Sequence, residues 1–151
     1  MVNFKVNYKE AEAFLERYAK HFSQFAEFEF NKLTLLNERR HEELSASLAE
    51  EQAFIMQTNA LEQKRIALFG DITLDRLSET APEMYREKIT QLSKEIRETI
   101  LHIKEMNDIA GVTANERLKR IHRYTKNLDI YNDRGTVKSN YAKIDAISEK
   151  V

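Results

Sequence analysis

The chain has 151 residues, of which 32% are charged and 42% hydrophobic, with three glycines and one proline. Because hairpins and βα loops need turn residues that are scarce here, the composition argues against all-β and α/β folds. The formal net charge of -1 offers no overall field that would attract nucleic acid or an anionic membrane. The absence of cysteine excludes disulfides and thiolate metal sites. These values favour one domain built from long amphipathic helices.

The first predicted element is a long helix from about Tyr8 to Leu44. Its apolar side chains recur at intervals of three and four residues, which is the spacing of one helical face. This face contains Tyr8, Ala11, Leu15, Tyr18, Phe22, Phe25, Phe28 and Leu36. Additional apolar side chains are Phe14, Phe30, Leu33 and Leu35. The apolar surface of this helix is larger than contact with one neighbouring helix can cover. We therefore expect that a second helix buries the rest or that part of it is a docking groove.

A break is predicted between His41 and Ser47, where the apolar periodicity falters. Ser47 and Glu50 form an S-x-x-E capping box, which is typical of a helix start. The second predicted helix ends before Gly70, a residue type that is common just past a helix C-terminus. Its expected apolar face contains Leu48, Ile55, Thr58, Leu61 and Leu68.

The third predicted long helix starts near a second capping box, formed by Thr80 and Glu83, with Pro82 in its first turn. Its stripe contains Ile89, Leu92, Ile96, Ile100, Ile103, Met106 and Ala110. Gly111 and a third capping box at Thr113 suggest a kink or an interruption, after which Leu118, Ile121, Thr125 and Leu128 resume the stripe. One bent helix and two helices in line fit this pattern equally well.

Together these patterns predict an all-α fold, an elongated antiparallel bundle of three to four long helices over residues 1–130. We expect the aromatic stripe of the first helix and the isoleucine stripe of the third to face one core. Residues 131–151 begin with a turn sequence and are polar, which predicts a flexible tail. Within the tail, Val137, Tyr141 and Ile144 recur at helical spacing. This stripe either folds back weakly or waits for a partner helix.

The sequence offers no arrangement typical of catalysis, and we expect no enzyme activity, cofactor or metal. Glu38 and His41 form one E-x-x-H motif, which would place a carboxylate and an imidazole on one helical face. A di-iron carboxylate bundle needs two such motifs and two further glutamates, and no second motif is present. The histidines are scattered singly along the chain.

One basic stretch follows the isoleucine stripe, at Arg117, Lys119, Arg120, His122, Arg123 and Lys126. We interpret it as a solvated helix face, with an acidic protein partner as the next interpretation. Nucleic acid is not expected, because the total charge is near neutral and no reading module is recognisable. The chain has neither the apolar core of a signal peptide nor a window that approaches a membrane span. We therefore expect a cytoplasmic protein without stable membrane insertion.

The order of these features resembles the FlgN family of flagellar export chaperones. The resemblance spans most of the chain and begins with the long aromatic first helix. It includes the stretch Glu-Glu-Leu-Ser-Ala-Ser-Leu at 42–48 and a second helix that ends Leu-Glu-Gln-Lys-Arg at 61–65. It continues with a third helix that carries Asn107 and Asn115, and with a Y-x-x-x-G turn from Tyr131 to Gly135 before a loose tail.

The resemblance implies a type III flagellar export chaperone that binds hook-associated proteins of the hook-filament junction. Such a chaperone prevents their premature assembly and brings them to the flagellar export apparatus, as a monomer or a weak homo-oligomer. The family binds its cargo through its C-terminal part. Here that part corresponds to Leu118, Ile121, Leu128, Ile130, Tyr131, Val137, Tyr141 and Ile144. The alternative function is a structural homodimeric coiled-coil scaffold, in which the surplus apolar face joins two copies.

Overall fold

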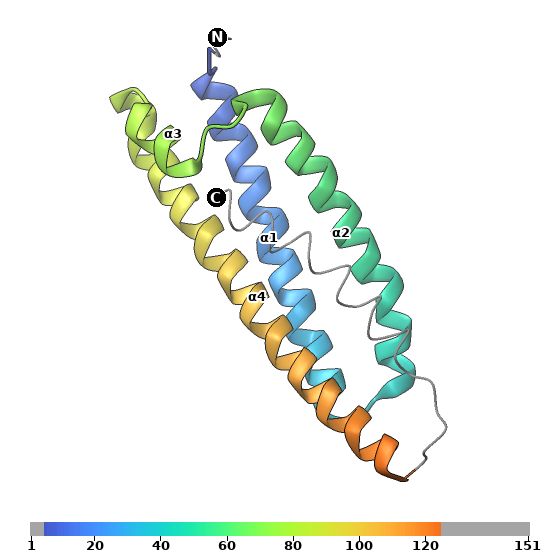
Figure 1. Ribbon diagram of the computed structural model, residues 1–151. Helices are drawn as coiled ribbons and strands as arrows, with labels where there is room; N and C mark the ends of the chain where they lie inside the picture. Colours follow the sequence, from blue (N-terminus) through green and yellow to red (C-terminus); the bar gives the residue numbers. More distant parts are fainter. Residues whose placement is uncertain (1–4, 125–151) are drawn as a thin grey trace.

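A computed structural model describes residues 5–124, which form an elongated bundle of helices (Figure 1). The elements are α1 (Tyr8–Asn37), α2 (His41–Phe69), α3 (Leu74–Thr80) and α4 (Glu83–Tyr124). Each long helix runs antiparallel to the long helix before it, so α1 and α4 run in the same direction. No strand occurs among the described residues. The predicted all-α, elongated antiparallel bundle is confirmed.

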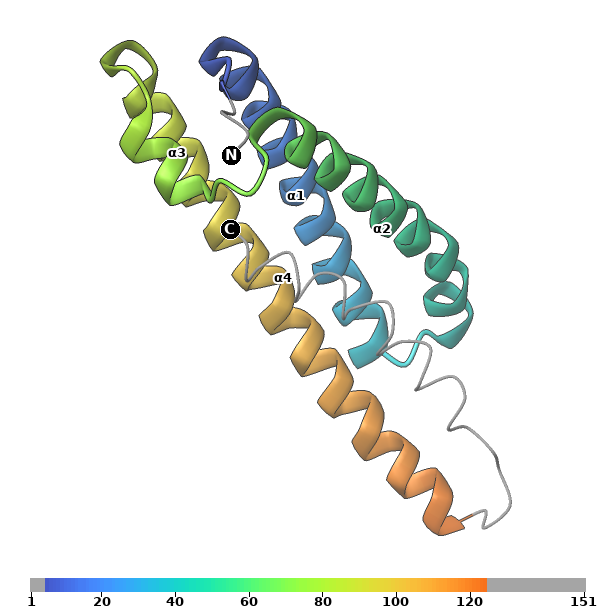
Figure 2. The same ribbon diagram turned by 45° about the horizontal axis from the view of Figure 1, so that its top comes forward.

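Helix α1 lies between the other two long helices and packs against both (Figure 2). Its contact with α2 is aromatic. The ring centroids of Phe25 and Phe28 each lie 5.2 Å from that of Phe54 of α2. Near the other end of α2, Phe14 meets Phe69 edge to face at 5.6 Å. Because α2 covers Phe14, the interpretation that a second helix buries the extra apolar surface of α1 is confirmed for this side chain.

The predicted core is confirmed, because the stripes of α1 and α4 belong to one buried cluster. From α1 this cluster includes Tyr18, Phe22 and Phe25, none of which exposes any surface. From α4 it includes Ile96, Ile100 and Ile103. Burying a side chain of this size contributes about 1.5–3 kcal/mol relative to leaving it exposed. The contact between α1 and α4 is therefore a main source of stability.

The turn between α1 and α2 occupies residues 38–40. Arg39 adopts a left-handed conformation with φ of 57°. The amide of Arg40 donates to the carbonyl oxygen of Leu35 at 3.0 Å, and the amide of Arg39 donates to that of Leu36 at 3.2 Å. This pair of bonds is the Schellman arrangement, which satisfies the last carbonyl groups of a helix. The arrangement usually has glycine at the left-handed position, and here it is built on arginine.

The break predicted between His41 and Ser47 is wrong, because the Schellman turn ends the first helix at Asn37. Both residues lie within α2. The hydroxyl of Ser47 donates to the carbonyl oxygen of Leu44 at 2.6 Å, so it bonds back along the helix instead of capping it. Leu48, which was predicted on the apolar face of this helix, is 51% exposed. The inward face of α2 contains Glu51, Ile55, Thr58, Leu61, Glu62, Arg65 and Phe69.

The connection from α2 to α4 contains a short helix that the sequence analysis did not predict. Gly70 follows α2 as expected, with φ of 63°. The hydroxyl of Thr73 then caps α3 by accepting from the amide of Arg76 at 3.2 Å. Leu74 and Leu77 of α3 are fully buried, and α3 packs against α4. This helix lies at the end of the bundle at which α1 begins, between the end of α2 and the start of α4 (Figure 1).

Helix α4 begins at Glu83, directly after Pro82, whose carbonyl oxygen accepts from the amide of Arg86 at 3.0 Å. The predicted capping role of Thr80 is wrong. Its hydroxyl donates to the carbonyl oxygen of Arg76 at 2.8 Å, because Thr80 is the last residue of α3.

Helix α4 is continuous through Gly111, so neither the kink nor the interruption is needed. The hydroxyl of Thr113 donates to the carbonyl oxygen of Ile109 at 3.0 Å, as a threonine inside a helix can. The third capping box therefore does not start a helix. The flexible tail predicted for residues 131–151 lies outside the described residues.

Replacing Gly111→Ala is expected to stabilise the protein by about 0.5–1 kcal/mol, because alanine restricts the unfolded chain and favours the helix. A Cβ atom added at Gly111 would meet nothing within 4 Å, so the folded state carries no steric cost. Urea denaturation of both proteins measures the difference. An unchanged or lower midpoint for the variant would show that α4 is bent or open at this position.

Replacing Ile100→Asp is expected to unfold the protein, since it would bury an unpaired charge in a marginally stable core. Leu101→Asp is the matched control, because Leu101 is 59% exposed and only one residue away. Circular dichroism with thermal melting compares the two variants. Equal melting temperatures would contradict the assignment of the inward face of α4.

Candidate partner-binding site

The end of α1 is marked by a contact from α4. The guanidinium group of Arg117 donates to the carbonyl oxygen of Leu36, and it lies 3.5 Å from that of Asn37. A cation at this position satisfies terminal carbonyl groups and interacts favourably with the negative end of the helix dipole. Beyond this contact α4 continues to Tyr124 and runs past the ends of α1 and α2 (Figures 1 and 2).

Two of the predicted cargo-binding residues lie on this last part of α4. Leu118 is half-buried, and Ile121 is 42% exposed. Ile121 follows the buried Ile103 by about five helical turns, so both occupy the same face of α4. The remaining predicted residues lie outside the described part of the chain: Leu128, Ile130, Tyr131, Val137, Tyr141 and Ile144.

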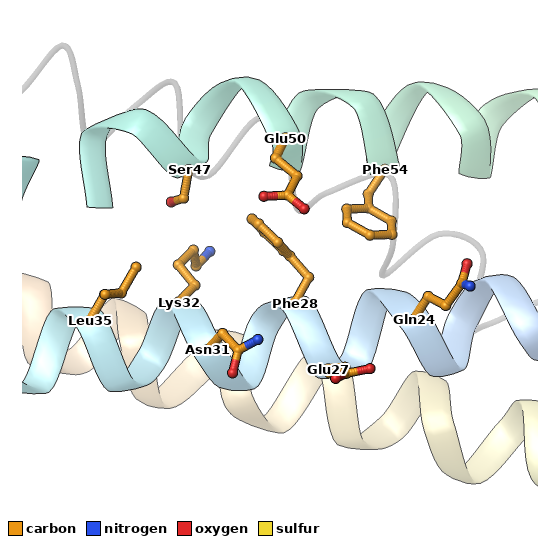
Figure 3. Close-up of a pocket in the computed structure, with 9 residues that line it drawn as sticks. All are labelled: Gln24, Glu27, Phe28, Asn31, Lys32, Leu35, Ser47, Glu50 and Phe54. Atoms are coloured by element: carbon orange, nitrogen blue, oxygen red, sulfur yellow. The ribbon is translucent and has the colours of Figure 1, made fainter. Parts of the chain in front are cut away.

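A second candidate surface is a pocket of about 400 Å³ between the C-terminal half of α1 and the N-terminal half of α2. Phe28 and Phe54 point toward one another across it (Figure 3). The residues that line it are Gln24, Glu27, Phe28, Asn31, Lys32, Leu35, Ser47, Glu50 and Phe54. Its aromatic walls could accept an apolar side chain, while the exposed carboxylates of Glu27 and Glu50 would favour a cation beside it.

The docking groove expected on the first helix is only partly present. Phe14 is buried and Leu33 packs against the core, so neither offers a surface to a partner. Leu35 lines the pocket between α1 and α2. Phe30 is 59% exposed and is not among the residues that line this pocket.

A buried charged cluster lies beside the pocket. The Nζ atom of Lys32 lies 3.0 Å from Oε2 of Glu29, and it also contacts Oε2 of Glu51 on α2. Burial raises the pKa of the Glu29 carboxyl to about 8; Lys32 opposes this shift, and the nearby Glu51 adds to it. The raised pKa favours the neutral form of the Glu29 carboxyl at neutral pH, which avoids a second buried negative charge beside Glu51.

A second polar group joins α1 to the C-terminal half of α2. The hydroxyl of Tyr18 donates to Oε2 of Glu62 at 3.0 Å, and Arg65 donates to both oxygens of the same carboxylate at 2.9 and 2.7 Å. Burial and the adjacent Glu62 raise the pKa of Tyr18, so it remains a neutral donor. Because each partner is satisfied, the group holds α1 and α2 in one register.

His21 provides a third polar contact between α1 and α2. Its Nε2 lies 2.7 Å from the hydroxyl oxygen of Thr58, which itself donates to the carbonyl oxygen of Phe54 at 2.8 Å. Thr58 must therefore accept, which assigns the proton of a neutral His21 to Nε2. Burial lowers the pKa of His21 to about 4, so the ring is neutral in the folded protein at physiological pH.

The sequence analysis placed Tyr18 and Thr58 on inward faces but missed their polar partners and the Lys32 cluster. A signal was available, because Glu29 and Lys32 are three residues apart within the apolar region of the first helix. On α2, Thr58, Glu62 and Arg65 follow one another at the helical spacing of four and three. Charged residues that occupy inward positions at this spacing predict a buried polar contact between helices.

The E-x-x-H motif is divided by the turn between α1 and α2. Glu38 caps α1, while His41 is the first residue of α2, so the two do not share one helical face. Within residues 5–124, no group of three or more His, Asp or Glu side chains is placed to hold a metal ion.

The basic stretch also has a structural part. Arg117 contacts the end of α1, whereas Lys119, Arg120 and Arg123 are exposed on α4. Lys126 lies outside the described residues. Within the described part of the chain, no helix combines the length and the apolarity needed to cross a membrane.

Comparison with known proteins gave one family. The family model described as FlgN protein matches residues 1–143, which is most of the chain. No significant match was found among curated proteins or among solved structures.

The raised pKa of Glu29 predicts that stability falls as the pH rises. The folded chain keeps a proton on Glu29 up to pH of about 8, while an unfolded glutamate has lost it above about 4.3. The free energy of unfolding should therefore decrease by about 1–2 kcal/mol between roughly pH 6.5 and 8.5. Below this window the lowered pKa of His21 acts in the opposite direction, because the unfolded chain then binds the extra proton.

Urea denaturation at both pH values tests this prediction. Glu29→Gln should remove the decrease, since the amide stays neutral at both pH values. Glu27→Gln is the matched control, because Glu27 is exposed, and it should keep the decrease. A wild-type protein that is equally stable at both pH values would contradict the buried, protonated state of Glu29.

Proposed function

Because the chain belongs to the FlgN family of flagellar export chaperones, we propose that it binds hook-associated proteins of the hook-filament junction. In this proposal the protein acts in the cytoplasm, where it prevents premature assembly of its cargo and delivers that cargo to the flagellar export apparatus. It acts by binding and carries out no catalysis.

The observation that carries the proposal is the extension of α4 past the end of α1. Leu118 and Ile121 continue the inward face of α4 beyond the level that Arg117 marks. Ile121 is 42% exposed, so the apolar side chains at this end of α4 suit the apolar face of a cargo helix. Cargo proteins that assemble through amphipathic terminal helices would present such a face.

We propose that the cargo site continues from α4 into the residues that follow it. In this view residues 1–130 are the bundle, and residues 131–151 are a flexible segment that contributes Val137, Tyr141 and Ile144. Ordering such a segment costs conformational entropy, which is offset only when a cargo helix covers its apolar side chains. Binding should therefore be specific and only moderately tight.

A chain that ends at Leu128 is expected to keep its melting temperature and to lose most of its affinity for a hook-filament junction protein. Among the described residues, α1 to α4 already form a continuous core, so we expect removal of residues after Leu128 to leave it in place. Isothermal titration against the C-terminal helix of such a cargo measures the loss. Undiminished affinity would move the site to another surface, such as the exposed Phe30, and an unfolded chain would show that the tail belongs to the core.

In the full-length protein, Ile121→Lys should weaken cargo binding at least about tenfold, which corresponds to roughly 1.4 kcal/mol. The matched control is Met84→Lys, because Met84 is an exposed apolar residue near the opposite end of α4. Equal affinities of the two variants would contradict the placement of the site at the end of α4.

A further inference from the structure

The outer face of α4 carries an unusual combination of exposed apolar and acidic side chains between residues 98 and 116. Leu101, Ile109 and Val112 are 59%, 48% and 59% exposed. The acidic residues on the same face are Glu98, Glu105, Asp108 and Glu116, all of them exposed. Their spacing of three and four residues places them on one side of the helix, away from the buried stripe that faces α1. We call this surface the acidic stripe.

The charge on this face reverses just after the acidic stripe. Lys119 lies seven residues after Val112, and Arg123 lies seven residues after Glu116, so both continue the same face. Both side chains are exposed. The outer face of α4 therefore consists of an acidic block with exposed apolar residues, followed by a basic block. A surface of this kind is complementary to its own reversed copy.

We propose that this face binds a second copy of the chain, with the two α4 helices antiparallel across a two-fold axis near residue 114. In this register Glu105 of each copy lies opposite Arg123 of the other, and Asp108 lies opposite Lys119. Val112 lies close to the axis and faces Glu116 of the second copy. The two Glu116 side chains lie equally close to the axis, so their repulsion weakens the pairing that the outer charged contacts favour. A parallel pairing would place like charges opposite one another, which is unfavourable. The symmetric pairing makes each charged contact twice.

The shape of the bundle leaves room for this pairing. The side chains of the acidic stripe are exposed, whereas the buried stripe of α4 packs in the core. The last part of α4 extends past α1 and α2 (Figure 2). Two copies would overlap along residues 105–123 and extend in opposite directions from the axis. This overlap is about 27 Å long at 1.5 Å per residue.

The pairing should be weak and sensitive to salt. A contact between two helices over this length is small compared with the roughly 1,200 Å² that stable interfaces bury. Its charged contacts lie at an exposed rim, where about 0.5 M salt screens them. The protein should therefore exchange reversibly between monomer and dimer, which differs from a permanent coiled-coil scaffold.

Sedimentation equilibrium of the full-length protein at low salt tests the proposal with two charge reversals. Glu105→Lys alone and Arg123→Glu alone should each weaken the dimer at least about tenfold, because each places like charges in both halves of the interface. An equimolar mixture of the two variants should restore association. In one heterodimer the two introduced charges face each other with opposite signs, and the native pair of Glu105 with Arg123 forms in the other half. Glu87→Lys is the control, because Glu87 is exposed on α4 outside the overlap, and it should leave association unchanged.

Three results would overturn the proposal. The first is a protein that stays monomeric at every concentration. The second is a dimer that neither reversal weakens, or that the mixture does not restore, because the contact would then lie elsewhere. The third is a monomeric wild-type protein in which Glu105→Lys abolishes binding of a hook-associated protein, which would assign this face to cargo. Helix content and melting temperature should match the wild type in each variant, so that loss of folding is distinguished from loss of contact.

Discussion

The bundle depends on one constraint: α1 must be apolar on two sides, because both α2 and α4 pack extensively against it. Aromatic side chains meet this constraint because each ring buries a large apolar area. Some rings of α1 contact α2, and others contact α4. Tyr18, Phe22 and Phe25 are therefore fully buried in the middle of the molecule. Helix α4 needs only one apolar side over this length, which leaves its outer face available for other contacts.

Buried polar groups add register to this apolar packing. Apolar faces tolerate sliding of one helix past another, whereas the bonds of Tyr18 to Glu62 and of His21 to Thr58 form in only one alignment. Buried charged contacts contribute little net stability, so specificity of the α1 and α2 pairing is the better account of the Lys32 cluster. The alignment of α4 has a separate marker, because Arg117 of α4 donates to the carbonyl oxygen of Leu36 at the end of α1.

The sequence predicted the helices, the shared core and the family, because long apolar periodicities dominate these properties. Helix ends were harder to predict, since the turn after α1 places Arg39 where glycine is usual. Capping-box patterns at Ser47 and Thr113 were misleading, because both hydroxyl groups bond back to carbonyl groups within their own helices. Of the predicted cargo site, the structure describes Leu118 and Ile121. Their place beyond the end of α1 could not be predicted, because the sequence analysis did not locate the residue at which α1 ends.

Hydrogen exchange of the full-length protein, with and without a bound hook-associated protein, tests the central claim most directly. The claim is that a preformed bundle binds cargo through the end of α4 and the residues that follow. It predicts that amides of α1 and α2 exchange equally slowly in both states, while protection increases from residue 118 onward. Protection gained around the pocket between Phe28 and Phe54, with none beyond residue 118, would contradict the claim.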